Sequence, residues 1–268
     1  MLLGCHDCPV STRPRPLRIR HWLVLCLAVG TLSLSACSAM ELSALKASAP
    51  TEGPQCRPAV EDGVRHFIIG YGSLIQEASR TSTAPQASPA VPIDVRGFRR
   101  GFFATGQQPG FNTVYLGIVP DAESHFNGVL FNVPAEDVQA LDRREGIYCR
   151  VAVPPSAVTM LQPGMAAPDG VMWVYVNQAR SIGLPSDTTP IIQSYVDIFL
   201  SGCLDIAEQT SLPGFAEDCV TTTTDWSPYW VNDRIFPRMP QAHQPQAKAI
   251  DTLLQRLVPR QFAAIRIE

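Results

Sequence analysis

Six short apolar runs typical of β-strands surround one segment with helical periodicity, and this pattern most constrains the fold. The helical segment covers residues 134–145. The strand-like runs are residues 66–71, 92–103, 113–119, 126–133, 148–153 and 171–176. We expect a turn at Pro120 and Asp121 between the third and fourth runs. Because strands and helices do not alternate regularly, the pattern predicts an α+β domain with a small mixed or antiparallel, barrel-like sheet.

The predicted helix has recognisable start and stop signals. Pro134 suits its first turn, and Glu136 and Asp137 lie near the positive end of the helix dipole. Two arginines occupy the last turn, and Gly146 is well placed as the terminating residue.

One face of this helix carries a carboxylate among apolar residues. Val138, Leu141 and Glu145 are spaced by three and then four residues, so they share one stripe. If the stripe faces the core, Glu145 is carried inward, its pKa rises, and it becomes a natural general base or acid. The alternative is an exposed helix-end glutamate, or one paired with Arg100 or Arg144.

The last third of the chain differs in character. Residues 188–200 and 246–258 are predicted to form amphipathic helices, the first with Tyr195 on its apolar side. An aromatic segment, residues 225–234, lies between them. Because these apolar faces need a partner surface, we expect residues 181–268 to form an extension packed on the core.

The aromatic segment has two interpretations. In the first, Trp226, Trp230, Asn232 and Arg234 roof a pocket, and Arg234 binds an anionic group. In the second, the aromatic side chains serve burial, and Asp233 and Arg234 form a surface pair.

Residues 1–37 have the pattern of an export signal. Four arginines precede a short apolar run, residues 22–34, which ends in Leu34-Ser35-Ala36-Cys37. These four residues resemble a bacterial lipobox, in which the peptidase cuts before the cysteine and the cysteine carries the lipid. The alternative is an ordinary signal or membrane anchor with a chance cysteine. The resemblance makes Cys37 the lipidation site and the membrane a partner.

The segment after the signal is expected to be a tether. Residues 38–62 are rich in Ala, Ser, Pro and Glu, which predicts a flexible linker to the domain. By resemblance to known sorting rules, Ser38 directs the lipoprotein to the outer membrane, facing the periplasm.

Four cysteines remain beyond the lipobox: Cys56, Cys149, Cys203 and Cys219. In an exported protein they favour disulfides over a metal site, and Cys203 with Cys219 would close a modest loop. No metal is expected, because no C-x-x-C pair occurs in this part of the chain. The formal net charge of −3 argues against a nucleic-acid partner.

Three motifs occur in order over residues 65–177. They are Gly70-Tyr71-Gly72-Ser73-Leu74, Val95-Arg96-Gly97-Phe98-Arg99-Arg100, and Leu141-Asp142-Arg143-Arg144-Glu145-Gly146, the last followed by a strand with Tyr148 and Arg150. Together they resemble the gamma-glutamylcyclotransferase-like family, in which the third segment bears the catalytic glutamate. The resemblance implies that residues 63–180 are the family core.

The resemblance also implies a site and a reaction. Tyr71, Gly72, Ser73 and Leu74 would bind the gamma-glutamyl head of a small substrate, opposite Glu145. The α-amino group then attacks the side-chain carbonyl, releasing 5-oxoproline and an amine, with Glu145 as base and no cofactor. Tyr148, like Arg234, is a possible further contact with the substrate.

Several residue roles stay open at this point. The Tyr71 hydroxyl binds the substrate carboxylate, or its ring packs in the core. Ser73 donates a hydrogen bond, or is an ordinary turn serine. Arg150 balances charge near Glu145, or lies on the surface. Cys149 is expected to be structural or disulfide-bonded rather than a nucleophile. A non-catalytic, tethered ligand-binding or envelope-assembly protein is the alternative function, and a different acid–base reaction on the same fold is the third.

Overall fold

The computed structural model describes residues 39–108, 111–239 and 246–267. The predicted export signal, residues 1–37, and the predicted lipidation site Cys37 lie outside the described residues. The chain divides into two units, Met1–Glu41 and Leu42–Glu268, and the described fold is that of the second. No helix in the described ranges is both long and apolar enough to span a bilayer.

A seven-stranded sheet forms the centre of the domain, in the order β4-β6-β1-β3-β2-β5, with β8 paired to β2. The strand β1 runs antiparallel to β3 and parallel to β6, so the sheet is mixed. The strands are β1 (His66–Gly70), β2 (Val91–Gln108), β3 (Phe111–Val133), β4 (Tyr148–Val153), β5 (Val158–Met160), β6 (Val171–Asn177) and β8 (Thr223–Thr224). The expectation of an α+β fold with a mixed sheet is confirmed.

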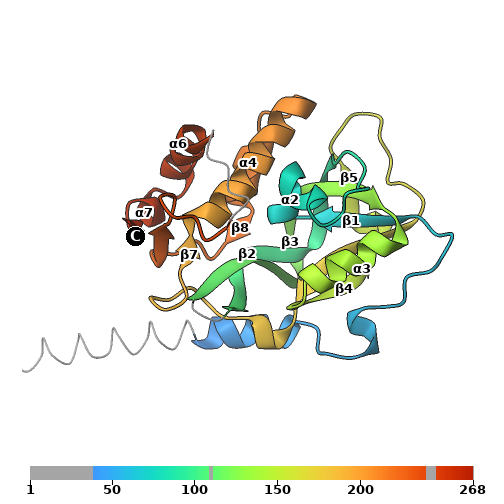
Figure 1. Ribbon diagram of the computed structural model, residues 1–268, viewed down its shortest axis with the longest axis horizontal. Coiled ribbons are helices and arrows are strands. Elements are labelled where there is room, and N and C mark those ends of the chain that lie inside the picture. Colours follow the sequence, from blue (N-terminus) through green and yellow to red (C-terminus); the bar gives the residue numbers. More distant parts are fainter. Residues whose placement is uncertain (1–38, 109–110, 240–245, 268) are drawn as a thin grey trace, which may run out of the picture. The chain divides into compact units, whose positions relative to one another are not determined.

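The strands β2 and β3 are longer than predicted and form one extended hairpin (Figure 1). Pro120 lies within β3 and pairs with Phe98, directly after a register shift between Arg96 and Phe98. Between the paired positions Arg96–His125 and Phe98–Pro120, Gly97 of β2 stands opposite four residues of β3, 121–124, so the bulge lies in β3. Gly97 itself has φ +89°. Because a proline without an N–H is tolerated beside such an irregularity, β3 continues through it. The two predicted strands are therefore one strand, and the interruption predicted at Pro120 and Asp121 is a bulge over residues 121–124 rather than a turn between strands.

The predicted helix is confirmed as α3 (Ala135–Arg144). Its inward stripe is also confirmed, since Val138 and Leu141 are fully buried. Glu145 caps the helix, with its N–H donating to the Leu141 carbonyl at 2.8 Å. Gly146 does not have a positive φ, so the glycine is not needed there as a left-handed terminator.

The segment predicted as a tether is attached to the domain at two points. Residues 42–48 are helical, and Leu45 packs against Phe103, Val119 and Ile182. Further on, Cys56 is disulfide-bonded to Cys149 in β4. These contacts differ from a flexible linker, because the spaced apolar residues and the cysteine find partners on the sheet.

The C-terminal part packs on the sheet and shares its core. Tyr195, Phe199 and Trp230 belong to the same buried cluster as Ile68 and Phe102. The elements are α4 (Gln193–Thr210), α5 (Phe215–Thr221), α6 (Ala247–Leu257), α7 (Pro259–Phe262) and a small parallel sheet of β7 (Ile191–Ile192), β9 (Trp230–Asn232) and β10 (Arg266–Ile267). In Figure 1, α4 lies between α6 and the short helices that follow β1, which are η2 (Ser73–Ile75) and α2 (Glu77–Thr81). The helix α4 begins five residues later than predicted and runs further.

Candidate active site

A cavity of about 380 Å³ brings the predicted site residues together. It is lined by the whole Tyr71-Gly72-Ser73-Leu74 segment and by Glu145. The other lining residues come from the end of α3, from the sheet and from the C-terminal part: Gly106, Tyr115, Leu116, Arg143, Arg144, Gly146, Ile147, Tyr148, Tyr175, Tyr195 and Met239. Within the described residues, no group of three or more His, Cys, Asp or Glu side chains has a metal-binding arrangement.

The loop after β1 offers backbone donors to the cavity. In the described part of the chain, the N–H groups of Gly72 and Ser73 have no hydrogen-bond acceptor. A Cβ at position 72 would lie 2.8 Å from the Tyr195 hydroxyl, so any other residue there would force the Tyr195 side chain to shift. The absence of a side chain at Gly72 therefore lets the Tyr195 hydroxyl lie close to the loop backbone.

Glu145 faces the cavity with its side chain 15% exposed. Burial raises the pKa of Glu145 above its ordinary value, and the positive charges of Arg144 and Arg57 oppose that rise. Arg57 also donates to the backbone carbonyls of Glu145 and Tyr148, at 3.0 and 3.1 Å. The carboxylate is thus held in place and kept partly desolvated, which suits a general base.

Arg144 connects the glutamate with the loop. Its Nε lies 3.2 Å from Glu145 Oε1, and its Nη2 donates to Ser73 Oγ at 3.1 Å. The same guanidinium donates to Ser79 and Thr83. Since Ser73 accepts here, its own hydroxyl proton has no acceptor among the described residues and is available to a ligand.

Tyrosines form much of the cavity wall, and most of their hydroxyl protons are already used. Tyr71 donates to the Tyr175 carbonyl at 2.7 Å, and Tyr148 donates to the Leu116 carbonyl at 2.9 Å. Tyr175 donates to Asp142 at 2.8 Å. The Tyr71 hydroxyl is therefore not free to bind a substrate carboxylate, and its core role is the one observed. Tyr148 lines the cavity, but its hydroxyl proton is likewise engaged.

Tyr195 differs from these three tyrosines. It is 5% exposed, and its oxygen accepts the Leu116 N–H at 3.2 Å. Its own proton has no acceptor in the described ranges. A buried hydroxyl with an unused donor is costly unless a ligand or water accepts from it. In the sequence, Tyr195 belongs to an apolar helix face, and this pattern predicts packing. The sequence therefore did not identify Tyr195 as a site residue.

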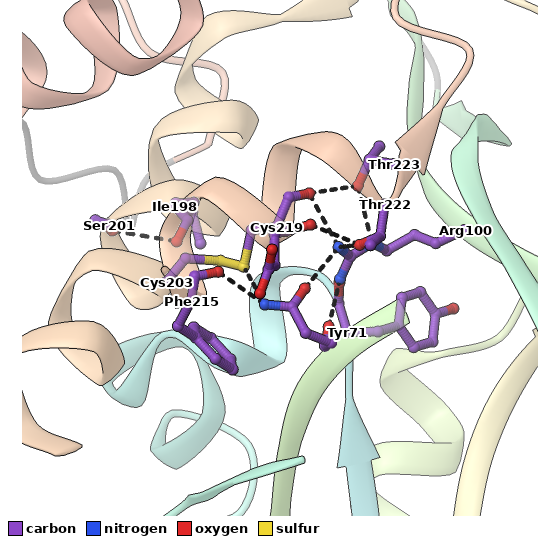
Figure 2. The surroundings of a disulfide bond; sticks show 11 residues. Tyr71, Arg100, Ile198, Ser201, Cys203, Phe215, Cys219, Thr222 and Thr223 are labelled. Atoms are coloured by element: carbon purple, nitrogen blue, oxygen red, sulfur yellow. Dashed lines mark hydrogen bonds between the residues drawn. A yellow bond between two sulfur atoms is a disulfide. The ribbon is translucent and has the colours of Figure 1, made fainter. Parts of the chain in front are cut away.

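Arg100 is hydrogen-bonded to the first residue of the loop, Tyr71, as Figure 2 shows. Its fully buried guanidinium donates to the carbonyls of Tyr71, Asn127 and Cys219, to the Asn127 side chain, and to Thr222 and Thr223. Burial lowers the pKa of Arg100 to about 9, so the group keeps its charge at neutral pH. It ties the loop to α5, which a Cys203–Cys219 disulfide joins to α4.

Three other expectations have clear structural outcomes. Arg234 does not line the cavity, because its guanidinium is paired with Asp197 and Asp251. The expected contact of Arg234 with the substrate is therefore wrong. The alternative, a surface pair of Arg234 with Asp233, is also wrong. Arg150 is buried and paired with Asp142 at 3.0 Å, so the surface role is wrong. Cys149 is disulfide-bonded, as expected.

The fold and the cavity define an α+β protein with a small site that combines one buried carboxylate with several neutral hydrogen-bond donors. No family model and no curated protein matches the chain. Among solved structures it resembles one described as a gamma-glutamyl cyclotransferase, with 15% identity and a TM-score of 0.45, over 58% of this chain and 86% of that one.

Two further structures are similar. An uncharacterized human protein shares 17% identity and a TM-score of 0.45, over 58% of this chain and 86% of its own. A yeast gamma-glutamyl cyclotransferase specific to glutathione shares 15% identity and a TM-score of 0.39, over 60% and 98%.

Proposed function

We propose that this protein converts a gamma-glutamyl amine or peptide into 5-oxoproline and the free amine. The observation that carries the proposal is that Glu145 and the loop from Tyr71 to Leu74 line one cavity. A cavity of about 380 Å³ suits a compact ligand held in a folded conformation.

In the proposed reaction, Glu145 takes a proton from the substrate α-amino group. The freed nitrogen attacks the side-chain carbonyl carbon, and the carbonyl electrons move to oxygen. The N–H groups of Gly72 and Ser73 and the Tyr195 hydroxyl donate hydrogen bonds to that oxyanion. As the carbonyl re-forms, the bond to the leaving nitrogen breaks, and Glu145 returns the proton to that nitrogen. A raised pKa of Glu145 supports both steps, because the group can accept and then release a proton.

A direct assay tests the proposal. The protein is mixed with gamma-glutamyl amino acids, gamma-glutamyl amines and glutathione, and 5-oxoproline is measured. We expect turnover of at least one of these compounds, and its loss in Glu145→Gln. Turnover that survives Glu145→Gln would assign the base elsewhere, and binding without turnover would favour a tethered ligand-binding protein.

We also propose that the protein is exported and lipid-anchored through Cys37, facing the periplasm from the outer membrane. Two disulfides, Cys56–Cys149 and Cys203–Cys219, support an oxidising compartment. Labelled fatty acid should attach to the wild-type chain and not to Cys37→Ala. Equal labelling of both would contradict the proposal.

A further inference from the structure

The segment that follows β9 binds the first turn of α4, next to Tyr195. Asp233 Oδ1 accepts the Ser194 N–H at 2.7 Å, and Asp233 Oδ2 accepts the Ser194 hydroxyl at 2.6 Å. Asp233 is only 2% exposed. Further along, the N–H of Arg238 donates to Asp233 Oδ2 at 2.9 Å, and the N–H of Met239 donates to Ser194 Oγ at 3.3 Å.

Asp233 supplies what α4 lacks at its own N-terminus. The residue before the helix, Ile192, makes no side-chain capping bond. The first N–H groups of a helix have no partner within the helix, and a carboxylate there satisfies a donor and favours the helix dipole. In this chain the capping carboxylate comes from 39 residues further along the sequence.

Arg234 binds α4 at the start of its second turn, at Asp197. Its Nε and Nη2 donate to the two oxygens of Asp197 at 2.8 and 2.7 Å. Its Nη1 donates to Asp251 of α6 at 2.8 Å. A bidentate arginine–carboxylate pair has a defined geometry, so it restrains the helix as well as attracting it. Asp197 is fully buried, which strengthens the pair.

Tyr195 therefore lies between two bound positions, residues 194 and 197. Its ring also meets Tyr115 edge-on, with ring centroids 5.0 Å apart. On another side it contacts Phe102, against which Trp226 packs with centroids 4.7 Å apart. The aromatic segment thus supports the Tyr195 ring through Phe102, while Asp233 and Arg234 fix the backbone that carries it.

We propose that Asp233 and Arg234 are positioning residues that hold the Tyr195 hydroxyl at the loop. This inference deepens the proposed function and rests on it for its catalytic consequence. Loss of either contact removes a restraint on the start of α4. Besides the ring contacts, the bond from the Leu116 N–H is then the one hydrogen bond that holds the Tyr195 oxygen within the described residues. A displacement of about 1 Å is enough to lower a rate by roughly a hundredfold.

A double-mutant cycle on the full-length chain separates positioning from general stabilisation. We expect Asp233→Asn to lower kcat by roughly tenfold to a hundredfold with little change in KM, because an oxyanion donor acts in the transition state. In a Tyr195→Phe background the same substitution should change kcat by less than about twofold. A merely structural role would lower kcat equally in both backgrounds, and this additive result would overturn the inference.

A second variant and a matched control keep the test sharp. If Asp233→Asn does not fold, Ser194→Ala removes the hydroxyl donor with a smaller change and enters the same cycle. Asp187→Asn is the control, because Asp187 has the same chemistry but forms an exposed pair with Arg266 at 3.0 Å. It should leave kcat and KM unchanged.

A measurement without substrate distinguishes failure of the inference from failure of the proposed function. In a chain with isotope-labelled tyrosine, the Tyr195 ring signal is assigned by its absence from Tyr195→Phe. Asp233→Asn or Ser194→Ala should shift or split this signal and leave that of Tyr175 unchanged. An unmoved Tyr195 signal overturns the inference whether or not the protein is active. A moved signal without any 5-oxoproline formation supports the positioning role and refutes the proposed reaction.

Discussion

Nε of Arg144 lies 3.2 Å from Oε1 of Glu145, the residue that follows it in the chain. The same guanidinium reaches Ser73 on the opposite loop at 3.1 Å. One cation therefore sets both the ionisation of the proposed base and the distance between the two parts of the site. Because of this contact, the direction in which the pH profile of the reaction shifts can be predicted when Arg144 is replaced.

Arg144→Gln should move the acid limb of the kcat/KM profile to higher pH. Glu145 must be deprotonated to act as base, so activity falls as the pH drops through its pKa. Burial raises that pKa and Arg144 opposes the rise; removing the cation therefore raises the pKa further. Profiles of wild type and variant check this. Arg256→Gln, which breaks an exposed pair with Glu217, is the control and should leave the limb in place. A limb that moves to lower pH in Arg144→Gln would contradict the account.

Gly72→Ala should lower kcat/KM by about tenfold or more, because the new Cβ would lie 2.8 Å from the Tyr195 hydroxyl and displace it. Gly146→Ala is a matched control in the same cavity. The nearest atom to a Cβ at Gly146 is 3.7 Å away, so that variant should keep near-wild-type activity. Steady-state kinetics of both variants decide the matter. Equal losses would mean that the approach of Tyr195 to the loop is unimportant.

Arg100→Lys should lower the free energy of unfolding by about 3 kcal/mol, since a lysine cannot satisfy the six acceptor contacts of the buried guanidinium. Denaturant unfolding measures the change. Arg266→Lys, at an exposed pair with Asp187, should stay within about 0.5 kcal/mol of wild type. A loss for Arg100→Lys as small as that of the control would show that the network contributes little.

Removal of the Cys203–Cys219 disulfide by alanine substitution at both positions should cost about 3 kcal/mol on a chain-entropy estimate, given the sequence separation of 16. Removal of Cys56–Cys149, with a separation of 93, should cost more on the same estimate. Denaturant unfolding ranks the two variants. Thiol counting of the unreduced, denatured chain gives an independent check, because none of these four cysteines should react. Free thiols at these positions would contradict both pairings.

The sequence predicted the features that depend on local periodicity and on a glycine-bearing motif. The helix α3 was predicted from the start and stop signals at its ends. Its inward stripe and the position of Glu145 followed from the spacing of Val138 and Leu141. The strands β1, β2, β4 and β6 were found for the same reason, whereas β3 was predicted as two strands and the short β5 and β8 were not predicted. The prediction at Pro120 and Asp121 located an irregularity but not its kind, because only the pairing of β3 with β2 shows that residues 121–124 form a bulge within one strand.

Residues that act through distant partners were beyond reach of the sequence. Tyr195 shows only an apolar helix face locally, and its unused hydroxyl proton becomes visible when β3 supplies the Leu116 N–H. Arg234 looked like an anion-binding residue because its two carboxylate partners lie 37 and 17 residues away. In each case the contact that sets the role of the side chain joins residues far apart in the sequence. Composition and local spacing therefore do not predict it.

The central claim is that Glu145 meets the α-amino group of a gamma-glutamyl compound that is held by the loop after β1. The most direct measurement is a crystal structure of Glu145→Gln with a bound gamma-glutamyl amino acid. We predict that the ligand α-amino nitrogen lies roughly 3 Å from the side chain of residue 145, with the side-chain carbonyl oxygen facing Gly72, Ser73 and the Tyr195 hydroxyl. A ligand bound outside this cavity, or one whose amino group points away from residue 145, would contradict the account.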